Sequence, residues 1–195
     1  MVRVAEFTAV EFFRTLRKNP VVPAVRTEGE PLDRALSGEH PAIFVLGGSI
    51  FKLTRTIEDQ RERPPVFVNV DLIGGLSGDK TGIDFLAQHV EGVISTNRHV
   101  IEMANSTGLI TVQRLFALDL GTTERGLKLI KRAQPDCVEV LPALTYPLLV
   151  ARHPEMRDRP VLAGGLIKNH EDQTLILEAG ATGISTSDEH LWKGA

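Results

Sequence analysis

Polar and charged side chains recur near the ends of short apolar runs along the chain, and together they could build a polar binding site. The set comprises Arg26, Asn69, Asp71, Ser95, Gln113, Arg114, Glu139 and Ser185. Two carboxylates at one site are costly to desolvate without partners, so Asp71 and Glu139 favour a site that binds something. Arg26 and Arg114 could supply the counter-charge. The alternative is a set of polar residues that hydrogen-bond to one another and bind nothing.

Two further stretches, rich in glycine and hydroxyl residues, could hold a phosphate group. Gly164 and Gly165 follow one apolar run, and Ser185, Thr186 and Ser187 lie at the end of the next run and just after it. Glycine permits close approach of the backbone to an anion, and the hydroxyl and backbone N–H groups of the second stretch can donate to it. We therefore predict that these five residues bind phosphate. In the alternative, the glycines only let the chain turn.

The elements that must position these residues repeat along the chain. After an amphipathic segment at 8–18, apolar runs alternate with stretches of helical spacing. The runs lie at 21–25, 42–46, 66–70, 92–95, 109–113, 137–141, 161–163 and 182–185. Strands that alternate with helices predict a parallel sheet, and eight such units close into a barrel. We predict an α/β fold in a single domain of residues 1–195: a compact (β/α)8 TIM-type barrel at 21–192 with an extra N-terminal helix at 8–18.

Alternation along each predicted strand assigns its side chains to the barrel interior or to the helix layer. In the run from 66 the valines alternate with Asn69 and Asp71, so these two polar residues are predicted to face inward. The same reasoning turns four more side chains inward, those of Ser95, Gln113, Glu139 and Ser185. Arg26 ends the first strand, whereas Arg114 is predicted to point toward the helices. Because ligand sites of this fold lie at the carboxyl ends of the strands, we expect one polar mouth there.

The composition limits the class of protein. The 195 residues are 42% hydrophobic and 24% charged, which is typical of a globular domain. The 22 Lys and Arg residues against 25 Asp and Glu give a net charge of -3, so no overall basic field indicates nucleic acid or an anionic membrane. The one cysteine excludes an intramolecular disulfide. No apolar run approaches the roughly 20 residues of a membrane span, and no signal peptide is recognised, so a cytoplasmic protein without a membrane partner is expected.

Catalytic side chains are not apparent at the predicted strand ends. No lysine ends a strand and the histidines fall in helices or loops, so no Schiff-base nucleophile, histidine base or metal site is predicted, and no cofactor. The eight units have roughly 22 residues each, against about 31 in a typical barrel. Little chain is left for lids that could close an active site, and this favours a sensor over an enzyme. The main alternative is an enzyme acting on a small phosphorylated metabolite, with Asp71 or Glu139 as acid, base or Mg²⁺ ligand.

One predicted helix carries a basic face. Arg125, Lys128 and Arg132 recur at helical spacing and could contact the phosphate backbone of RNA. Solvated helix faces in most proteins have the same pattern, so this assignment has a plain structural alternative.

Several longer motifs occur in order over nearly the whole chain: VVPAVR (21–26), DLIGGL (71–76), GVISTNRHVI (92–101), TVQRLFALD (111–119), PDCVEVLP (135–142), PVLAGGLI (160–167) and GATGISTSDEHLW (180–192). Together they resemble the motifs of the glycerol-3-phosphate-responsive antiterminators of glycerol-uptake operons. The chain departs from members of that family at Gly74 and Leu120, and at Asn69, where they tend to have histidine.

This resemblance implies a small TIM-type barrel that binds sn-glycerol 3-phosphate. It further implies that the ligand-bound form binds leader mRNA and prevents transcription termination ahead of glycerol-utilisation genes. Asp71, Gln113 and Glu139 would then accept hydrogen bonds from the glycerol hydroxyls, and Arg26 and Arg114 would balance the phosphate or those carboxylates. A barrel that binds the ligand but not RNA is a third hypothesis, and a homo-oligomer stays open.

Overall fold

Eight parallel strands form a closed barrel in the computed structural model of this chain, which describes residues 7–27, 29–60 and 62–192. The strands are β1 (Val21–Val25), β2 (Ile43–Val45), β4 (Val66–Asn69), β6 (Gly92–Ser95), β7 (Ile110–Phe116), β8 (Cys137–Leu141), β9 (Val161–Gly164) and β10 (Gly183–Thr186). Neighbours in the barrel are neighbours in the chain, and β10 closes on β1. The predicted TIM-type barrel is confirmed.

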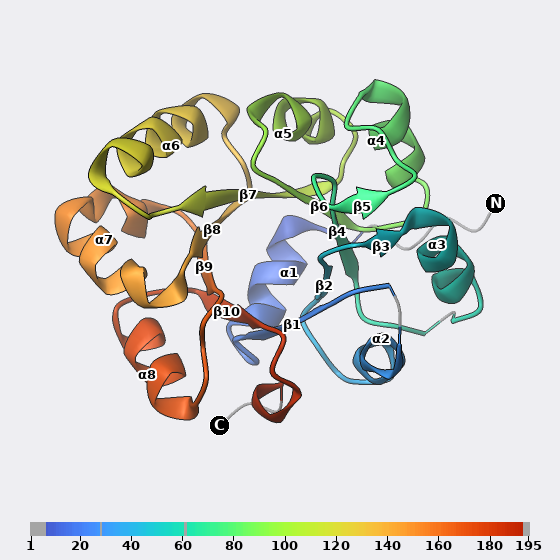
Figure 1. The fold of residues 1–195 in the computed structure, drawn as a ribbon, viewed down its shortest axis with the longest axis horizontal. Coiled ribbons are helices and arrows are strands. Elements are labelled where there is room, and N and C mark those ends of the chain that lie inside the picture. Colours follow the sequence, from blue (N-terminus) through green and yellow to red (C-terminus); the bar gives the residue numbers. More distant parts are fainter. Residues whose placement is uncertain (1–6, 28, 61, 193–195) are drawn as a thin grey trace.

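Helices follow the strands and ring them on the outside (Figure 1). They are α2 (Glu30–Leu36), α3 (Ile50–Glu58), α4 (Lys80–Leu86), α5 (Arg98–Asn105), α6 (Leu120–Ala133), α7 (Tyr146–Arg152) and α8 (His170–Glu178), with 3-10 turns η1 (Ala143–Thr145), η2 (Pro154–Asp158) and η3 (Glu189–Leu191). A small second sheet, which alternation did not predict, pairs β3 (Gly48–Ser49) with β5 (Ile73–Gly74) in the loops that follow β2 and β4.

The leading helix α1 (Ala9–Leu16) lies across the centre of the ring in Figure 1. A capping box starts it, because the Thr8 side chain accepts from the Glu11 backbone N–H while the Glu11 carboxylate accepts from that of Thr8. Phe12 and Leu16 are fully buried among the inward-facing strand residues, and the Phe12 and Phe67 ring centroids are 4.9 Å apart. Leu16 packs near Gly183, the first residue of β10, so α1 closes the N-terminal end of the barrel.

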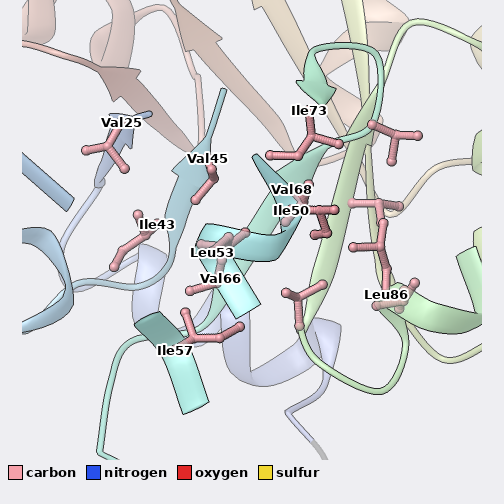
Figure 2. Close-up of a cluster of buried hydrophobic side chains, with 14 of the residues drawn as sticks. Val25, Ile43, Val45, Ile50, Leu53, Ile57, Val66, Val68, Ile73 and Leu86 are labelled. Carbon is pink, nitrogen blue, oxygen red and sulfur yellow. The ribbon is translucent and has the colours of Figure 1, made fainter. Parts of the chain in front are cut away.

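Alternate strand residues pack into two separate layers. Figure 2 shows the outer layer, in which outward-facing residues such as Val45, Val66 and Val68 pack against Leu53 of α3 and Leu86 of α4. The inner layer fills the barrel with Val22, Ala24, Phe44, Phe67, Ile94, Ile110, Val112, Cys137 and Leu162. Burial raises the pKa of the Cys137 thiol, as expected of a core cysteine. Burial on both faces explains why the strands read as continuous apolar runs.

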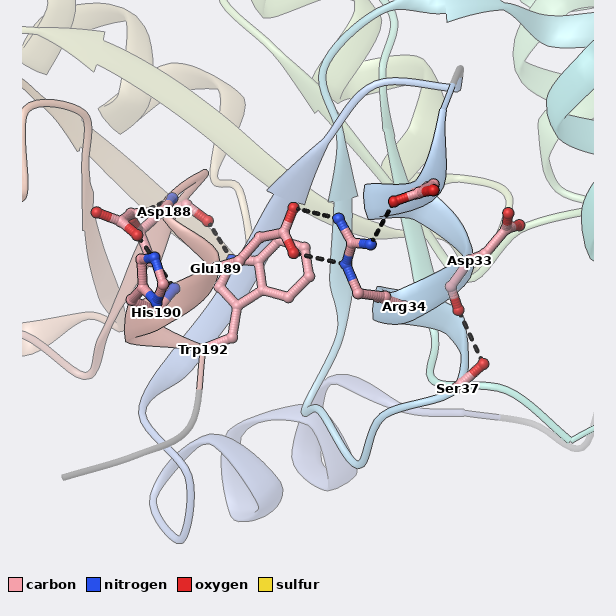
Figure 3. A network of polar contacts seen from close by, with 9 residues as sticks. Asp33, Arg34, Ser37, Asp188, Glu189, His190 and Trp192 are labelled. Carbon is pink, nitrogen blue, oxygen red and sulfur yellow. Dashed lines mark hydrogen bonds and ion pairs between the residues drawn. The ribbon is translucent and has the colours of Figure 1, made fainter.

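An ion pair joins the first and last units of the barrel, which adjoin because β10 pairs with β1. Arg34 on α2 donates from Nε and Nη2 to the two carboxylate oxygens of Glu189 on η3, at 2.6 and 2.9 Å (Figure 3). Its Nη1 donates to Glu30 of its own helix at 2.9 Å. Trp192 follows η3 and donates from its indole N–H to the Thr186 carbonyl at 3.0 Å. These contacts hold the last turn of the chain against α2.

The Arg34–Glu189 pair predicts a small pH-dependent contribution to stability. Hydrogen bonding from Arg34 holds the pKa of Glu189 below its ordinary value of 4.5. A lowered folded-state pKa stabilises the protein above the unfolded-state pKa, and this stabilisation is lost as the pH falls through the folded-state value. Glu189→Gln is therefore expected to lower the Tm slightly at pH 7, and the difference from wild type should shrink below pH 4.5. Scanning calorimetry across that range checks this.

Glu30→Gln is the matched control, because Glu30 contacts the same guanidinium but its side chain is 85% exposed, against 34% for Glu189. An exposed pair within one helix contributes less than a pair that joins two elements. Equal Tm values for Glu189→Gln and wild type at every pH would contradict the prediction.

Candidate functional site

A buried ion pair lies at the carboxyl ends of β7 and β8. Arg114 donates from Nε to Glu139 Oε2 at 2.8 Å, and the two residues are in register on adjacent strands. Ser185 of β10 donates to the other oxygen, Glu139 Oε1, at 2.5 Å. The Glu139 side chain is 1% exposed and that of Arg114 11%. Both oxygens of the buried carboxylate are thus partnered within the protein.

Gly164 makes room for this network. A Cβ atom at Gly164 would lie 2.8 Å from Glu139 Oε1 and would overlap the Ser185 hydroxyl. The glycine on β9 therefore serves the contact between its neighbouring strands β8 and β10. The backbone then enters the left-handed region at Gly165 (φ 76°) and Leu166 (φ 62°). Leucine rarely adopts this conformation, and such strain gathers at functional loops.

A second polar cluster lies across the mouth, at the ends of β4 and β6. Asp71 accepts from the Ser95 hydroxyl at 2.5 Å, and from the backbone N–H and hydroxyl of Thr96 at 2.6 and 2.8 Å. Asn69 accepts from the Asp71 backbone N–H at 3.0 Å and is fully buried. Its Nδ2 has no hydrogen-bond partner among the described residues. Asn69 is in register with Ile94 of the inner layer, so its side chain lies on the inward face at the end of β4.

Arg26 is the first residue after β1 and is exposed at the mouth. Val22 and Ala24 of β1 face the interior, so alternation turns Arg26 to the same side. Its guanidinium lies beside Gly47, where an added Cβ would be 3.0 Å from Nη1. Within the described part of the chain, no carboxylate lies within 4.0 Å of Arg26, whereas Arg114 is paired with Glu139. Arg26 is therefore a cation available to a ligand.

The predicted orientation of β7 is wrong. Ile110 and Val112 belong to the inner layer, not the helix layer. Gln113 therefore faces outward, in register with the outward-facing Val138, and Arg114 faces the mouth. The physical reason is that apolar side chains around Phe12 of α1 fill the N-terminal end of the barrel. Ile110 and Val112 therefore face inward, and the polar residue that directly follows each of them faces the helices. Gln113 is thus not placed to contact a ligand in the mouth.

The same correction applies to β6. Ile94, not Val93, fills the interior, so alternation places Ser95 on the outward face. Its hydroxyl nevertheless reaches Asp71, which lies beyond the end of β4. Ser95 therefore positions the Asp71 carboxylate. Thr96, which the sequence reasoning missed, donates twice to the same carboxylate and follows Ser95 in the ISTN segment.

Of the residues predicted to bind phosphate, some are engaged in hydrogen bonds within the protein and others are exposed. Ser185 is committed to Glu139, and the Thr186 hydroxyl accepts from the Asp188 backbone N–H at 3.1 Å. Gly165 and Ser187 are exposed at the ends of the same two strands. The helix starts nearby are capped by side chains, α8 by Asn169 and η3 by Asp188. These caps satisfy N–H groups that could otherwise have bound an anion.

The match to a family covers nearly the whole barrel. The profile described as "Glycerol-3-phosphate responsive antiterminator" matches residues 21–192. The chain belongs to this family. A solved glycerol uptake operon antiterminator regulatory protein from Listeria monocytogenes strain 4b F2365 is 29% identical, covers 90% of this chain and 95% of its own, and has a TM-score of 0.80. An antiterminator-related protein from Thermotoga maritima MSB8 is 30% identical, with 90% and 98% covered and a TM-score of 0.77. The uncharacterized protein YgcP of Escherichia coli (strain K12) is 31% identical over 180 residues, 91% of this chain and 93% of YgcP.

Aldolases share the barrel of this antiterminator-family protein at 12–15% identity, a likeness that shows the fold alone. Among the described residues, the inward-facing positions at the strand ends hold neither lysine nor histidine. No three His, Cys, Asp or Glu side chains gather as a metal site in the same ranges. None of the helices described is long and apolar enough to span a membrane.

The basic face that the sequence assigned to RNA lies on α6 of this family member. Arg125, Lys128 and Arg132 are exposed there, as expected of residues on the outward face of a surface helix. Arg125 donates to the Thr122 hydroxyl at 3.3 Å on the same helix. The structure thus agrees with the surface position of these residues and leaves their role in RNA binding a prediction.

Proposed function

We propose that this protein binds sn-glycerol 3-phosphate at the barrel mouth and that the ligand-bound form binds leader mRNA as a cytoplasmic transcription antiterminator. The single observation that carries the ligand proposal is the contrast between the two arginines of the mouth. Arg114 is neutralised by Glu139, whereas Arg26 has no acidic partner among the described residues. An available guanidinium beside polar groups suits a phosphorylated ligand.

The phosphate is placed between the ends of β1, β9 and β10. Because β10 pairs with β1 on one side and with β9 on the other, Arg26, Ser187 and Gly165 lie on adjoining strand ends. Arg26 supplies the charge-assisted hydrogen bonds, and the Ser187 hydroxyl and the Gly165 backbone border the same space. Gly164, Ser185 and Thr186 support this rim from within.

The glycerol hydroxyls are placed toward β4. The unpartnered Asn69 Nδ2 can donate to a hydroxyl oxygen, and the exposed Asp71 carboxylate can accept from a hydroxyl. A buried donor without a partner costs about 1–3 kcal/mol, so a ligand oxygen that reaches Asn69 recovers that free energy. Both carboxylate oxygens of Glu139 already accept hydrogen bonds, so its role is to position Arg114 and Ser185.

A binding role accounts for these contacts better than catalysis. The buried Glu139 carboxylate accepts hydrogen bonds from Arg114 and Ser185. The exposed Asp71 carboxylate accepts three, one from Ser95 and two from Thr96. A ligand that bridges Arg26 and Asn69 would favour one arrangement of the loops between them. Ligand and RNA affinities are then reciprocally coupled, since each shifts the same equilibrium.

Two measurements test the proposal on the wild-type chain. Isothermal titration with sn-glycerol 3-phosphate is expected to show one site, with glycerol and inorganic phosphate each binding far more weakly. A gel shift with leader RNA from glycerol-utilisation genes is expected to need the ligand. No heat and no thermal shift at millimolar ligand would overturn the ligand assignment, and turnover of a sugar phosphate that disappears in Asp71→Asn would favour the enzyme instead.

A further inference from the structure

An aromatic ring stands exposed on the first turn of α3. Phe51 is 70% exposed, although its neighbours Ile50 and Leu53 are buried in the outer layer. It borders a cavity of about 400 Å³ between α3 and the loop after β1, lined by Thr27, Gly29, Phe51, Lys52, Arg55 and Thr56. A large apolar side chain exposed beside a surface hollow marks a place where a partner can bind.

The ring of Phe51 is held in position from one side. A Cβ atom at Gly75 would lie 2.8 Å from Phe51 Cε2, so the ring edge rests against the loop after β5. The glycine admits the ring there, and a side chain would displace it. Phe51 is thus a positioned aromatic platform, which loses little conformational entropy when a flat group stacks on it.

Cations lie beside this platform. Arg55 follows Phe51 by one helical turn and has no carboxylate within 4.0 Å in the described ranges, and Lys52 lies at the rim of the same cavity. An aromatic ring and a guanidinium beside a cavity of about 400 Å³ fit one nucleotide, with the base on the Phe51 ring and a phosphate on Arg55. The basic face of α6 lacks this combination, because α6 contains no aromatic residue.

Backbone contacts connect this surface to the barrel mouth. Thr27 lines the cavity, and its hydroxyl accepts from the backbone N–H of Ser49, the residue that caps α3, at 2.9 Å. The Thr27 backbone N–H donates to Gly47 at 3.0 Å, and Gly47 lies against the Arg26 guanidinium. A phosphate that fixes Arg26 therefore acts on the segment that starts α3.

We propose that leader RNA in its single-stranded form binds to the α3 face, formed by Phe51, Lys52 and Arg55, with one base stacked on Phe51. This inference rests on the proposed function, because it names the surface on which that function meets RNA. It moves the principal RNA contact from α6 to α3. The α3 face adjoins the ligand site, so the ligand controls RNA binding over a short distance.

The test uses full-length variants in gel shifts with leader RNA at saturating glycerol 3-phosphate. Phe51→Ala is expected to weaken RNA binding about 10-fold or more, whereas Phe51→Tyr keeps a stacking surface and should restore it. Arg55→Ala should lower the slope of log affinity against log salt by about 0.7, the loss of one phosphate contact. Titration calorimetry should find ligand affinity in the absence of RNA unchanged in all three variants.

Lys128→Ala on α6 is the matched control, expected to bind RNA within about 2-fold of wild type. RNA binding that falls in Lys128→Ala but not in Phe51→Ala or Arg55→Ala would overturn the α3 face and leave the proposed function standing. RNA binding absent from the wild type as well would overturn both. If Phe51→Ala and Phe51→Tyr both lost RNA binding, stacking of a base on the ring would not be the cause of the loss.

Discussion

Arg26→Ala is expected to weaken the binding of glycerol 3-phosphate about 100-fold in titration calorimetry. A charge-assisted hydrogen bond contributes about 1.5–3 kcal/mol, and each 1.4 kcal/mol corresponds to a factor of about 10 in affinity. The loss is large because Arg114, the other arginine of the mouth, is already bound to Glu139 and is not free to replace Arg26. Arg26→Lys keeps the charge without the forked geometry and should recover part of the affinity.

Arg98→Ala is the matched control for this prediction. Arg98 starts α5, at the same end of the barrel, and its guanidinium pairs with Glu102 at 3.0 Å. Its removal should leave ligand affinity within about 2-fold, since that arginine is already engaged by a neighbour. Because Arg26 is exposed and unpaired among the described residues, Arg26→Ala should also unfold at the wild-type temperature. Unchanged ligand affinity in Arg26→Ala would show that the phosphate binds elsewhere.

Glu139→Ala is expected to destabilise the folded protein by about 3–5 kcal/mol, because it leaves a buried charge without its partner. The Arg114 side chain is 11% exposed and would lose its counter-ion, and the Ser185 hydroxyl would lose its acceptor. Urea or guanidinium denaturation measures the change in unfolding free energy. Glu139→Gln keeps an acceptor for Ser185 and should cost clearly less than alanine.

A double replacement separates the charge from the shape of the site. Arg114→Met combined with Glu139→Leu removes both charges together and should recover much of the stability lost in Glu139→Ala. It should not recover the hydrogen bond from Ser185. If Glu139→Ala unfolded like wild type, the carboxylate would have to be hydrated, and its buried position in the structure would be wrong.

The sequence alone was sufficient for the architecture. The apolar runs predicted at 21–25, 92–95 and 137–141 are β1, β6 and β8 to the residue, and the other five lie within three residues of a barrel strand at either end. Parallel strands covered by helices must be apolar on both faces, so they stand out as continuous runs. The buried faces of the helices are harder to assign from the sequence: in α8, Leu175 is 51% exposed whereas the adjacent Ile176 is fully buried.

Only the tertiary structure decided which strand face turns inward. Alternation divides the residues of β7 into two sets, and both sets contain apolar and polar members, so local pattern cannot choose between them. The choice depends on Phe12 of α1, which demands apolar neighbours in the lower barrel, and on the register with β8. Those two constraints turned Arg114 into the mouth and Gln113 out of it.

The same limit applies to the candidate site. Sequence reasoning found Arg26, Asp71 and Glu139 as charged residues near strand ends, but it left open which charges pair. Arg114 reaches Glu139 across 25 residues of sequence, and Ser185 reaches it across 46. Such contacts are set by strand register around a closed barrel, and a guanidinium is free for a ligand only when that register gives it no carboxylate. The sequence therefore determined the barrel and its polar residues, and the closure of the barrel decided that Arg26 is the arginine left for a ligand.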